Sequence, residues 1–339
     1  MSGYARVLTA AAIACFVVSL ALCEVIRRQA IRRALLDAVN ERSLHTAPTP
    51  RLGGVAIVVT TLLASMATWQ LASRELRVLV VLCGGIALVG LRDDLRPVSA
   101  LTRFALQFAA AIAFVWIAGV PPLLVARGIA LPVPSLVTGA ILVVWIVGVL
   151  NIYNFMDGMD GLAGFQTVAA SAALAALLGG GSPSLFALAL GASASGFLAH
   201  NFPPARIFMG DAGSTFIGMA FAALAVLGMH HDKPLTESAL PLAPFLLDGT
   251  FTIFRRALRR EKVWQAHRTH LYQRAVQTGL AHREVLLVYM AWIGVSCGGA
   301  LLASSAAGAI ALAWGASVLG LALVWRWVVR RESERANAP

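Results

Sequence analysis

Charged side chains are scarce in this chain, and their scarcity excludes a soluble globular protein. Only 13% of its 339 residues are charged, whereas 59% are hydrophobic. A soluble domain typically has about a quarter of its residues charged, which keeps its surface wetted. The composition therefore predicts an integral membrane protein with an all-α fold.

Cysteine is also rare, and its placement excludes a disulfide framework. Cys15, Cys23, Cys83 and Cys297 all lie in apolar stretches and show no paired spacing. Neither a set of disulfides nor a thiolate metal site is expected from this pattern. Internal repeats and low-complexity tracts are lacking as well, so we predict a single polytopic domain over 1–339.

Long apolar runs, by contrast, fill most of the chain. A helix needs roughly 17 to 25 mostly apolar residues to cross a bilayer. Stretches of this kind lie at 7–26, 53–72, 77–91, 102–120, 134–150, 162–179, 184–200, 213–229, 238–254, 284–303 and 306–327. We therefore predict a bundle of about eleven transmembrane helices.

The basic residues predict how this bundle is oriented, because Lys and Arg favour the cytoplasmic side of a membrane. With the N-terminus outside and the C-terminus inside, 22 of the 27 Lys and Arg are cytoplasmic. They lie in the segments 27–52, 92–103, 201–212, 255–283 and 326–339. The net charge of +11 follows from this asymmetry and suits anionic lipids, so no nucleic-acid partner is required.

Several acidic residues stand where apolar runs end on the expected cytoplasmic side. They are Asp93 and Asp94 in GLRDDLRP, Asp157 and Asp160 in NIYNFMDGMDGLAG, and Asp211 in RIFMGDAGS. Carboxylates at a membrane edge are costly, so they are functional candidates by default. We predict one site from them. Its loops are 27–52, 92–103, 151–161, 201–214 and 255–283.

Each acidic motif also has a purely structural explanation. Asp93 and Asp94 end a helix whose dipole is already negative there, and neighbouring arginines would balance them as solvated charges. An Asn/Asp/Gly turn between two helices accounts for 151–161. Asp211 precedes a helix and would serve as its N-cap. The functional explanation gains weight because three such motifs share one face of the membrane.

A divalent metal would unite these motifs. Four side chains with oxygen ligands lie within ten residues: Asn151, Asn154, Asp157 and Asp160. Oxygen ligands suit Mg²⁺, which typically takes one or two carboxylates together with substrate phosphate oxygens. The helix that starts near Asp211 would receive such a phosphate. We therefore expect Mg²⁺ as cofactor, with Mn²⁺ as the alternative.

A basic segment nearer the C-terminus carries His267 and His270 in AHRTHLYQR. Solvated histidines in a basic cytoplasmic loop are one explanation, because such loops are expected in any membrane protein. The other is that the two histidines, together with Arg268, Tyr272 and Arg274, grip a diphosphate and its developing charge.

In combination, these motifs resemble the polyprenyl-phosphate N-acetylhexosamine-1-phosphate transferases, the MraY- and WecA-like enzymes of glycosyltransferase family 4. The resemblance covers about residues 48 to 275. Its motifs follow the family's order: PRLGG at 50–54, the Asp93–Asp94 pair, NxxNFMDGMDGLAG at 151–164, FMGDAGS at 208–214 and HRTH at 267–270.

Two departures from the pattern of the cell-wall enzyme favour the branch that initiates O-antigen or capsule synthesis. Phe155 and Met156 precede the first Asp-Gly, where that enzyme has a threonine, and HRTH replaces a denser histidine motif. In addition, Leu95, Arg96 and Pro97 follow the aspartate pair, where some members have an acid or a lysine. The donor candidates are UDP-GlcNAc, UDP-QuiNAc and UDP-FucNAc.

The resemblance implies transfer of a sugar 1-phosphate from a UDP-linked amino sugar to undecaprenyl phosphate, with release of UMP. This reaction takes place on the cytoplasmic face of the bacterial inner membrane and requires Mg²⁺. By resemblance, we predict that Asp211 and Asn154 bind the metal. The predicted catalytic residues are Asp93, Asp94, Asp157, Asp160 and His270. The predicted substrate-binding residues are Asn151, Asn154, His267, Arg268 and Arg51.

The sequence leaves some alternatives open. Direct attack by the lipid phosphate is favoured over an aspartyl-phosphate route, because a phosphate monoester is largely ionised at neutral pH and needs positioning more than a covalent relay. A magnesium-dependent diphosphate hydrolase and an ion-coupled transporter are the rival functions. A transporter would place its carboxylates near the bilayer midplane, whereas these lie at one edge. A homodimer is compatible with this interpretation.

Overall fold

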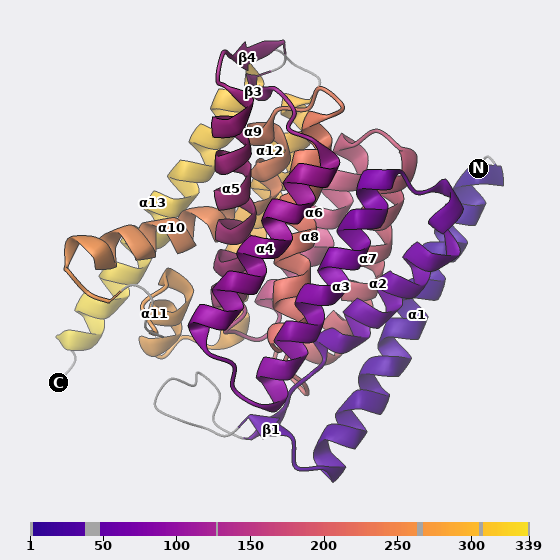
Figure 1. Cartoon of the computed structure of the whole chain (residues 1–339). Coiled ribbons are helices and arrows are strands. Elements are labelled where there is room, and N and C mark those ends of the chain that lie inside the picture. Colours follow the sequence, from indigo (N-terminus) through magenta and orange to yellow (C-terminus); the bar gives the residue numbers. More distant parts are fainter. Residues whose placement is uncertain (1–2, 38–47, 127, 263–266, 305–307, 338–339) are drawn as a thin grey trace.

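Successive helices run in alternating directions, so loops far apart in the sequence meet at the same end of the molecule (Figure 1). The computed structural model describes residues 3–37, 48–126, 128–262, 267–304 and 308–337. The helices are α1 (Gly3–Arg32), α2 (Gly54–Ala67), α3 (Arg74–Leu95), α4 (Ala100–Ala118), α5 (Ser135–Met156), α6 (Leu162–Leu177), α7 (Gly181–Asn201), α8 (Asp211–Met229), α9 (Leu235–Ala239), α10 (Ala243–Leu258), α11 (Leu271–Gln277), α12 (His282–Ala303) and α13 (Ala309–Ala336).

Short elements connect these helices. The strands β1 (Leu36–Asp37) and β2 (Thr49–Pro50) pair at one end of the bundle, and β3 (Leu123–Ala126) and β4 (Ile129–Leu131) pair at the other. Single 3-10 turns are η1 (Trp69–Leu71) and η2 (Leu240–Leu242). Much of the predicted loop 27–52 is outside the described residues, and its first residues continue α1.

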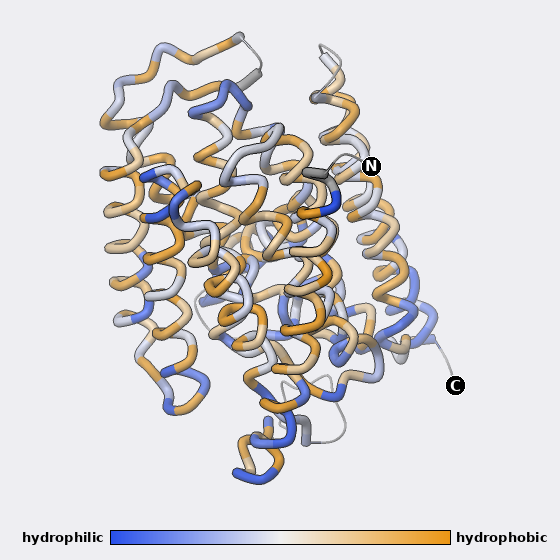
Figure 2. Tube along the Cα trace, turned by 90° about the vertical axis from the view of Figure 1, so that its right-hand side faces the viewer, coloured by the Kyte–Doolittle hydropathy of each residue, from blue (hydrophilic) through white to orange (hydrophobic). Residues whose placement is uncertain are grey.

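Apolar helices confirm the predicted class of protein. Seven helices among the described residues are long and apolar enough to cross a membrane, namely α1, α4, α5, α7, α8, α12 and α13; α2 and α6 are apolar but shorter. In Figure 2 most of the helical tube is coloured as hydrophobic, and many of the strongly hydrophilic residues lie in loops and near helix ends. The chain is therefore a multi-pass helical membrane protein. Eleven crossings and the N-out orientation stay predictions.

The predicted span at 238–254 differs from the structure, because it is not one continuous helix. Pro241 lies in η2, and Pro244 lies in the first turn of α10. Proline lacks the N–H that a helix interior needs, so two prolines this close together divide the segment into α9, η2 and α10. Hydropathy alone does not reveal this break, because it averages over the two prolines. α10 then runs across the bundle rather than along it (Figure 1).

The core of the bundle is α8, whose apolar window is entirely buried. Small residues let its neighbours approach closely, as in many membrane helix pairs. A Cβ on Gly213 would meet the Cα of Gly54 in α2, and one on Gly218 would meet the Cα of Leu150 in α5. α1 and α13 lie at the outside and are the least buried spans.

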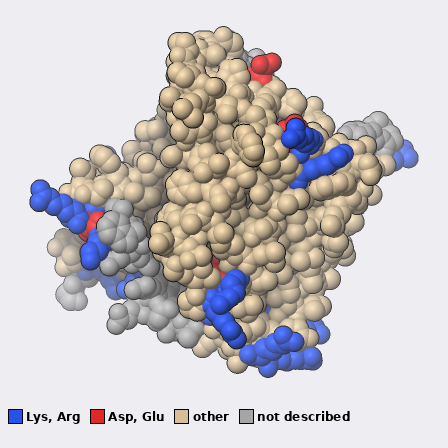
Figure 3. Space-filling model, viewed as in Figure 1, with Lys and Arg blue, Asp and Glu red and all other residues tan. Residues whose placement is uncertain are grey.

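On the face shown in Figure 3, charged side chains lie toward the margins. In Figure 3 the broad middle of the visible face is almost entirely uncharged, while Lys and Arg lie along its edges. We call the end that carries β1, α11 and the C-terminus the motif end, because the acidic motifs lie there (Figure 1).

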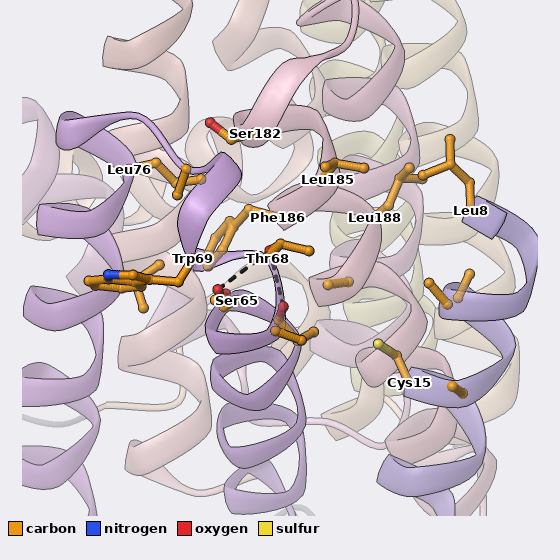
Figure 4. Close-up of a pocket in the computed structure, with 18 residues that line it drawn as sticks. Leu8, Cys15, Ser65, Thr68, Trp69, Leu76, Ser182, Leu185, Phe186 and Leu188 are labelled. Carbon is orange, nitrogen blue, oxygen red and sulfur yellow. Dashed lines mark hydrogen bonds between the residues drawn. The ribbon is translucent and has the colours of Figure 1, made fainter. Parts of the chain in front are cut away.

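An apolar cavity lies toward the opposite end, between α1, α2, α3 and α7 (Figure 4). Leu8, Cys15, Trp69 and Phe186 are among its lining residues. The Ser65 hydroxyl in its wall donates a hydrogen bond to a backbone carbonyl of its own helix (2.8 Å). The lining is therefore almost wholly apolar and offers no chemistry comparable to that of the motif end.

Candidate functional site

Three of the predicted motifs meet at the motif end, where α3 and α5 finish and α8 begins. Their approach depends on Gly90 in α3, because a Cβ at this position would collide with the backbone of Asp211. Helix α3 therefore packs directly against the first turn of α8. Asp93 and Asp94 lie one turn after Gly90 and reach that same turn.

Asp94 binds the N-terminus of α8. Its Oδ1 accepts a hydrogen bond from the N–H of Asp211 (2.9 Å), and its Oδ2 accepts one from the N–H of Ala212 (3.0 Å). These N–H groups lack partners within the helix and form the positive end of its dipole. The charge of Arg51 also acts on the Asp94 carboxylate. Both effects offset the cost of a carboxylate at the C-terminal end of α3.

Asp93 and Asp211 share one cation, Arg103 of α4. The Arg103 Nη1 lies 2.6 Å from the Oδ2 of Asp93 and 3.0 Å from the Oδ2 of Asp211. The other oxygen of Asp93 accepts a hydrogen bond from the N–H of Val98 (2.6 Å). Asp93, Asp94 and Asp211 thus form one connected cluster.

The two asparagines of α5 face the same pocket. Asn151 Nδ2 donates to the Oε1 of Gln107 (2.7 Å), and Asn154 Oδ1 accepts a hydrogen bond from the hydroxyl of Ser214 (2.5 Å). The residues that line the pocket include Gly90, Arg103, Gln107, Asn151, Asn154 and Asp211. A metal or a phosphate in this pocket would therefore meet a carboxylate, three amides and a guanidinium.

Asp157 caps the end of α5 beside this cluster, and its carboxyl group makes no hydrogen bond to any residue that the structure describes. Burial raises the pKa of Asp157 well above its usual value, and the negative charges of Asp211 and Asp94 raise it further. A bound cation would counter this effect. A positive partner would therefore stabilise the charged form of Asp157.

Asp160 lies apart from this cluster, although the sequence placed it in the same motif. Its Oδ2 accepts a hydrogen bond from the N–H of Ala205 (2.9 Å), and its Oδ1 lies 3.1 Å from the Nδ1 of His282. The side chain thus joins the loop after α5 to the loop before α8 and to α12. The structure assigns it these structural contacts, and the predicted catalytic role stays a prediction.

The histidine segment docks onto the end of α5 through Tyr272 of α11. The Tyr272 hydroxyl donates to the carbonyl of Phe155 (3.0 Å), and a Cβ on Gly158 would run into this hydroxyl. The rings of His267 and His270 lie 4.9 Å apart, and the His270 ring stacks against Tyr272 with centroids 5.9 Å apart. Both predicted histidines are thus packed next to the asparagine motif.

The histidines differ in their surroundings. The His270 side chain is 2% exposed, whereas His267 is half-buried. Burial, together with the nearby charges of His270 and Arg256, lowers the pKa of His267 to about 4. His267 is therefore neutral at pH 7. It would meet a diphosphate as a hydrogen-bonding group rather than as a cation.

The basic residues of this segment also separate into two kinds. Arg268 is exposed. Arg274 instead forms a two-pronged ion pair with Glu332 of α13, at 2.8 Å and 2.6 Å. The diphosphate grip predicted for Arg274 is thus opposed by this pairing, because its guanidinium anchors α11 to α13.

With this geometry in view, the chain was compared with known proteins. A model of glycosyl transferase family 4 matches residues 76–229. A probable undecaprenyl-phosphate N-acetylglucosaminyl 1-phosphate transferase from Bacillus subtilis (strain 168) is 30% identical over 297 residues, which cover 81% of this chain and 80% of that protein. The chain belongs to glycosyl transferase family 4.

Other relatives of this family 4 protein differ in how much of the chain they match. The decaprenyl-phosphate N-acetylglucosaminephosphotransferase of Mycolicibacterium smegmatis (strain ATCC 700084 / mc(2)155) is 31% identical over 319 residues, covering 81% of this chain and 77% of its own. A phospho-N-acetylmuramoyl-pentapeptide-transferase from Trichormus variabilis (strain ATCC 29413 / PCC 7937) is 35% identical over 226 residues, covering 62% and 59%. The N-acetylglucosamine enzymes thus match a longer part of the chain.

The residues of this family 4 protein suit a hard divalent cation. Within the described ranges, no three His, Cys, Asp or Glu side chains lie close enough to hold a metal by themselves. Mg²⁺ does not need such a cage, because it keeps waters and takes one or two carboxylates together with substrate phosphates. Asp211 and Asn154 on the pocket wall, with Asp157 beside them, supply the oxygen atoms that such an ion prefers.

Sequence reasoning missed Arg103 and Gln107. Both lie on α4, which contributes no recognisable motif. Arg103 contacts Asp93 and Gln107 contacts Asn151 only because α4 packs against α3 and α5. One signal was available. Arg103 is a lone cation in the first turns of an apolar helix, four residues after the N-cap Ser99, on the side where the acidic motifs end.

Proposed function

We propose that this chain transfers N-acetylhexosamine 1-phosphate from a UDP-linked amino sugar to undecaprenyl phosphate, releasing UMP and forming a lipid-linked sugar diphosphate. Membership of family 4 supports this class of reaction. The relatives that match most of the chain carry N-acetylglucosamine in their names, which favours UDP-GlcNAc over UDP-QuiNAc and UDP-FucNAc. The product would initiate a cell-surface polysaccharide such as O-antigen or capsule.

The single observation that carries this proposal is the composite cluster of Asp93, Arg103 and Asp211 beside the carboxyl group of Asp157. Transfer between two phosphate compounds concentrates negative charge, so it needs cations and precise positioning more than acid–base groups. A pocket with one fixed arginine and several oxygen ligands supports that chemistry. It opens among apolar helix ends, where a lipid phosphate can arrive from the bilayer.

In the proposed reaction, an oxygen of the lipid phosphate attacks the phosphorus that bears the sugar. A new P–O bond forms as the bond from that phosphorus to the bridging oxygen breaks, and this oxygen leaves with UMP. Arg103 would hold the lipid phosphate close to Asp93 and Asp211, while His270 and Arg268 would contact the donor diphosphate from the other side. Asn151 and Asn154 would orient the donor through their amides.

Mg²⁺ would be held by Asp211 and Asn154, and when bound it would neutralise the charge that builds up on the phosphates. The polar groups of this chain have the complementary task of keeping both substrates in line. A cation bound in this place would stabilise the carboxylate form of Asp157, whose pKa burial otherwise raises.

The contacts of Asp94 support direct displacement over an aspartyl-phosphate route through this residue. Both of its carboxylate oxygens accept hydrogen bonds from the backbone of α8. A covalent intermediate on Asp94 would have to give up at least one of these bonds and uncap the helix. Each such hydrogen bond to a charged group is worth roughly 1.5–3 kcal/mol.

The test is an assay of UMP release. Purified protein is mixed with undecaprenyl phosphate, Mg²⁺ and one of UDP-GlcNAc, UDP-QuiNAc or UDP-FucNAc, with and without the lipid and with and without a chelator. We expect release that depends on the lipid and on Mg²⁺, and that falls at least about 100-fold in Asp211→Asn. Asp232→Asn, the same change at the opposite end of the bundle, is the matched control and should remain active.

The outcomes separate the rival functions. Release of UMP or phosphate without the lipid would identify a hydrolase instead. A folded protein that releases nothing from any donor would contradict the transferase and reopen the transporter. Activity that survives exhaustive chelation would overturn the assignment of Mg²⁺ while leaving the transferase in place.

A further inference from the structure

A second carboxylate site lies behind the histidine segment, in a part of the chain where no motif pointed to it. Asp248 belongs to α10, and its side chain is completely buried. Removing a carboxylate from water costs several kcal/mol unless hydrogen bonds and charges compensate. A fully buried aspartate in an otherwise apolar stretch therefore calls for an explanation from its contacts.

Those contacts join three helices. The Oδ1 of Asp248 accepts hydrogen bonds from the N–H of Leu271 (3.0 Å) and from the hydroxyl of Thr252 (3.1 Å). Its Oδ2 accepts one from the hydroxyl of Tyr289 in α12 (2.6 Å). Leu271 is the first residue of α11 and follows His270 directly. The carboxylate thus fixes the backbone immediately after this histidine.

The imidazole of His270 lies against the same carboxylate. Its Nδ1 is 3.7 Å from the Oδ1 of Asp248, and the ring is closed in by His267 and Tyr272. Both ring nitrogens are buried, and neither has a hydrogen-bond partner among the residues that the structure describes. A buried imidazole of this kind is a costly arrangement unless a ligand completes it.

The distance of 3.7 Å is too long for a hydrogen bond, yet it places a negative charge next to one particular nitrogen. A carboxylate favours the tautomer that has its N–H pointing toward it, and in doing so sets the role of the other nitrogen. Such contacts are often long before substrate binds and shorten in the complex.

We propose that Asp248 is a positioning residue that acts through His270. It holds the ring by its grip on Leu271 and favours the proton on Nδ1, which leaves Nε2, on the far side of the ring, to meet the donor diphosphate. The inference rests on the proposed function, because that function places the diphosphate against His270. The alternative is that Asp248 only stabilises the packing of α10, α11 and α12.

A double-mutant cycle distinguishes these two roles. Lipid-dependent UMP release is measured for wild type, Asp248→Asn, His270→Gln and the double variant, with kcat and KM for the donor determined separately. Loss of a group that orients a functional side chain typically costs about 10- to 100-fold in activity, and we expect Asp248→Asn to fall in this range. In the His270→Gln background the same change should cost less than about 2-fold, because its target is gone.

The control is Glu332→Gln, which releases the other end of α11 by breaking the ion pair with Arg274. Its effect should multiply with that of His270→Gln, because it does not act through the ring. If Asp248→Asn also multiplies with His270→Gln, the positioning role is refuted and only a packing role remains.

Protein quality is checked by size-exclusion chromatography in detergent. Should Asp248→Asn fail to fold, the cycle is repeated with Tyr289→Phe, which removes one hydrogen bond from the carboxylate and keeps its charge. We expect Tyr289→Phe to change activity less than about 2-fold while lowering the unfolding temperature. A loss of activity as large as that of His270→Gln would contradict a role carried by the charge of Asp248. A wild type that is inactive in this assay overturns the proposed function itself, whereas an active wild type with multiplying effects overturns only the role of Asp248.

Discussion

At the scale of single residues, Arg103 sets the charge balance of the candidate site. Its guanidinium forms ion pairs with both Asp93 and Asp211. Asp94 instead accepts hydrogen bonds from the N-terminus of α8. Arg103 is about one third exposed, so solvent weakens each pair only in part. The cluster therefore retains negative charge, which suits a metal and would repel a substrate phosphate if the arginine were lost.

We predict that Arg103→Gln lowers kcat/KM for lipid-dependent UMP release by about 100-fold, because two facing carboxylates then lack their shared cation. Arg103→Lys keeps the charge but cannot bridge two carboxylates with one planar group, so an intermediate loss is expected. Steady-state kinetics with the lipid as the varied substrate would measure this. Wild-type rates in Arg103→Gln would show that the bridge has no part in the reaction.

His267 allows a prediction about pH. Its pKa is about 4 in the folded protein, below the ordinary value of 6.5. Between these two pH values the unfolded chain is therefore protonated at His267, whereas the folded chain is not. Folding stability is therefore lost as the pH falls from about 6.5 to about 4. Over this range the unfolding temperature of His267→Gln should fall less than that of wild type, as measured by thermal denaturation in detergent. Parallel curves for the two proteins would contradict the assigned burial.

At the scale of elements, the site depends on how closely α3 approaches α8. The last turn of α3 must lie close enough for Asp94 to reach the N–H groups of Asp211 and Ala212. Gly90 permits this approach, since a side chain there has no room beside the Asp211 backbone. Catalytic geometry and helix packing are thus determined by the same contact.

The matched pair Gly90→Ala and Gly85→Ala tests this contact within one helix. A Cβ on Gly90 collides with the α8 backbone, whereas one on Gly85 meets no described atom within 4 Å. We expect Gly90→Ala to lose about 1–3 kcal/mol of stability and most activity, as in other overpacked contacts. Gly85→Ala should be neutral or slightly stabilising, because alanine is the better helix former. Thermal unfolding and UMP release measure both effects, and equal behaviour of the two variants would refute the explanation.

Sequence patterns were sufficient for some elements and not for others. Among the described residues, most of the apolar runs correspond to a single helix, because a backbone in hydrocarbon must satisfy its own hydrogen bonds. The division at Pro241 and Pro244 was missed because hydropathy averages over such breaks. The partners Arg103 and Asp248 were missed because they join the site only through contacts between helices distant in sequence.

At the scale of the whole molecule, the start of α1 and the end of α13 lie at opposite ends of the bundle (Figure 1). The start of α1 is on the side of the β3–β4 hairpin, whereas the end of α13 lies with the motif end. An odd number of crossings, such as the predicted eleven, gives this arrangement. The excess of Lys and Arg in the segments of the motif end favours its exposure to the cytoplasm.

Cysteine labelling in whole cells would test this orientation. The native cysteines are buried, so wild type should react little with a membrane-impermeant maleimide. Asp232 is exposed after α8 at the end opposite the motifs, and Ser333 is exposed near the end of α13. We expect Asp232→Cys to be labelled in intact cells and Ser333→Cys only after permeabilisation. The reverse pattern would place the carboxylate cluster outside the cell, where a UDP-linked donor made in the cytoplasm cannot reach it. Labelling of both variants from the same side would contradict the arrangement of the bundle in the membrane.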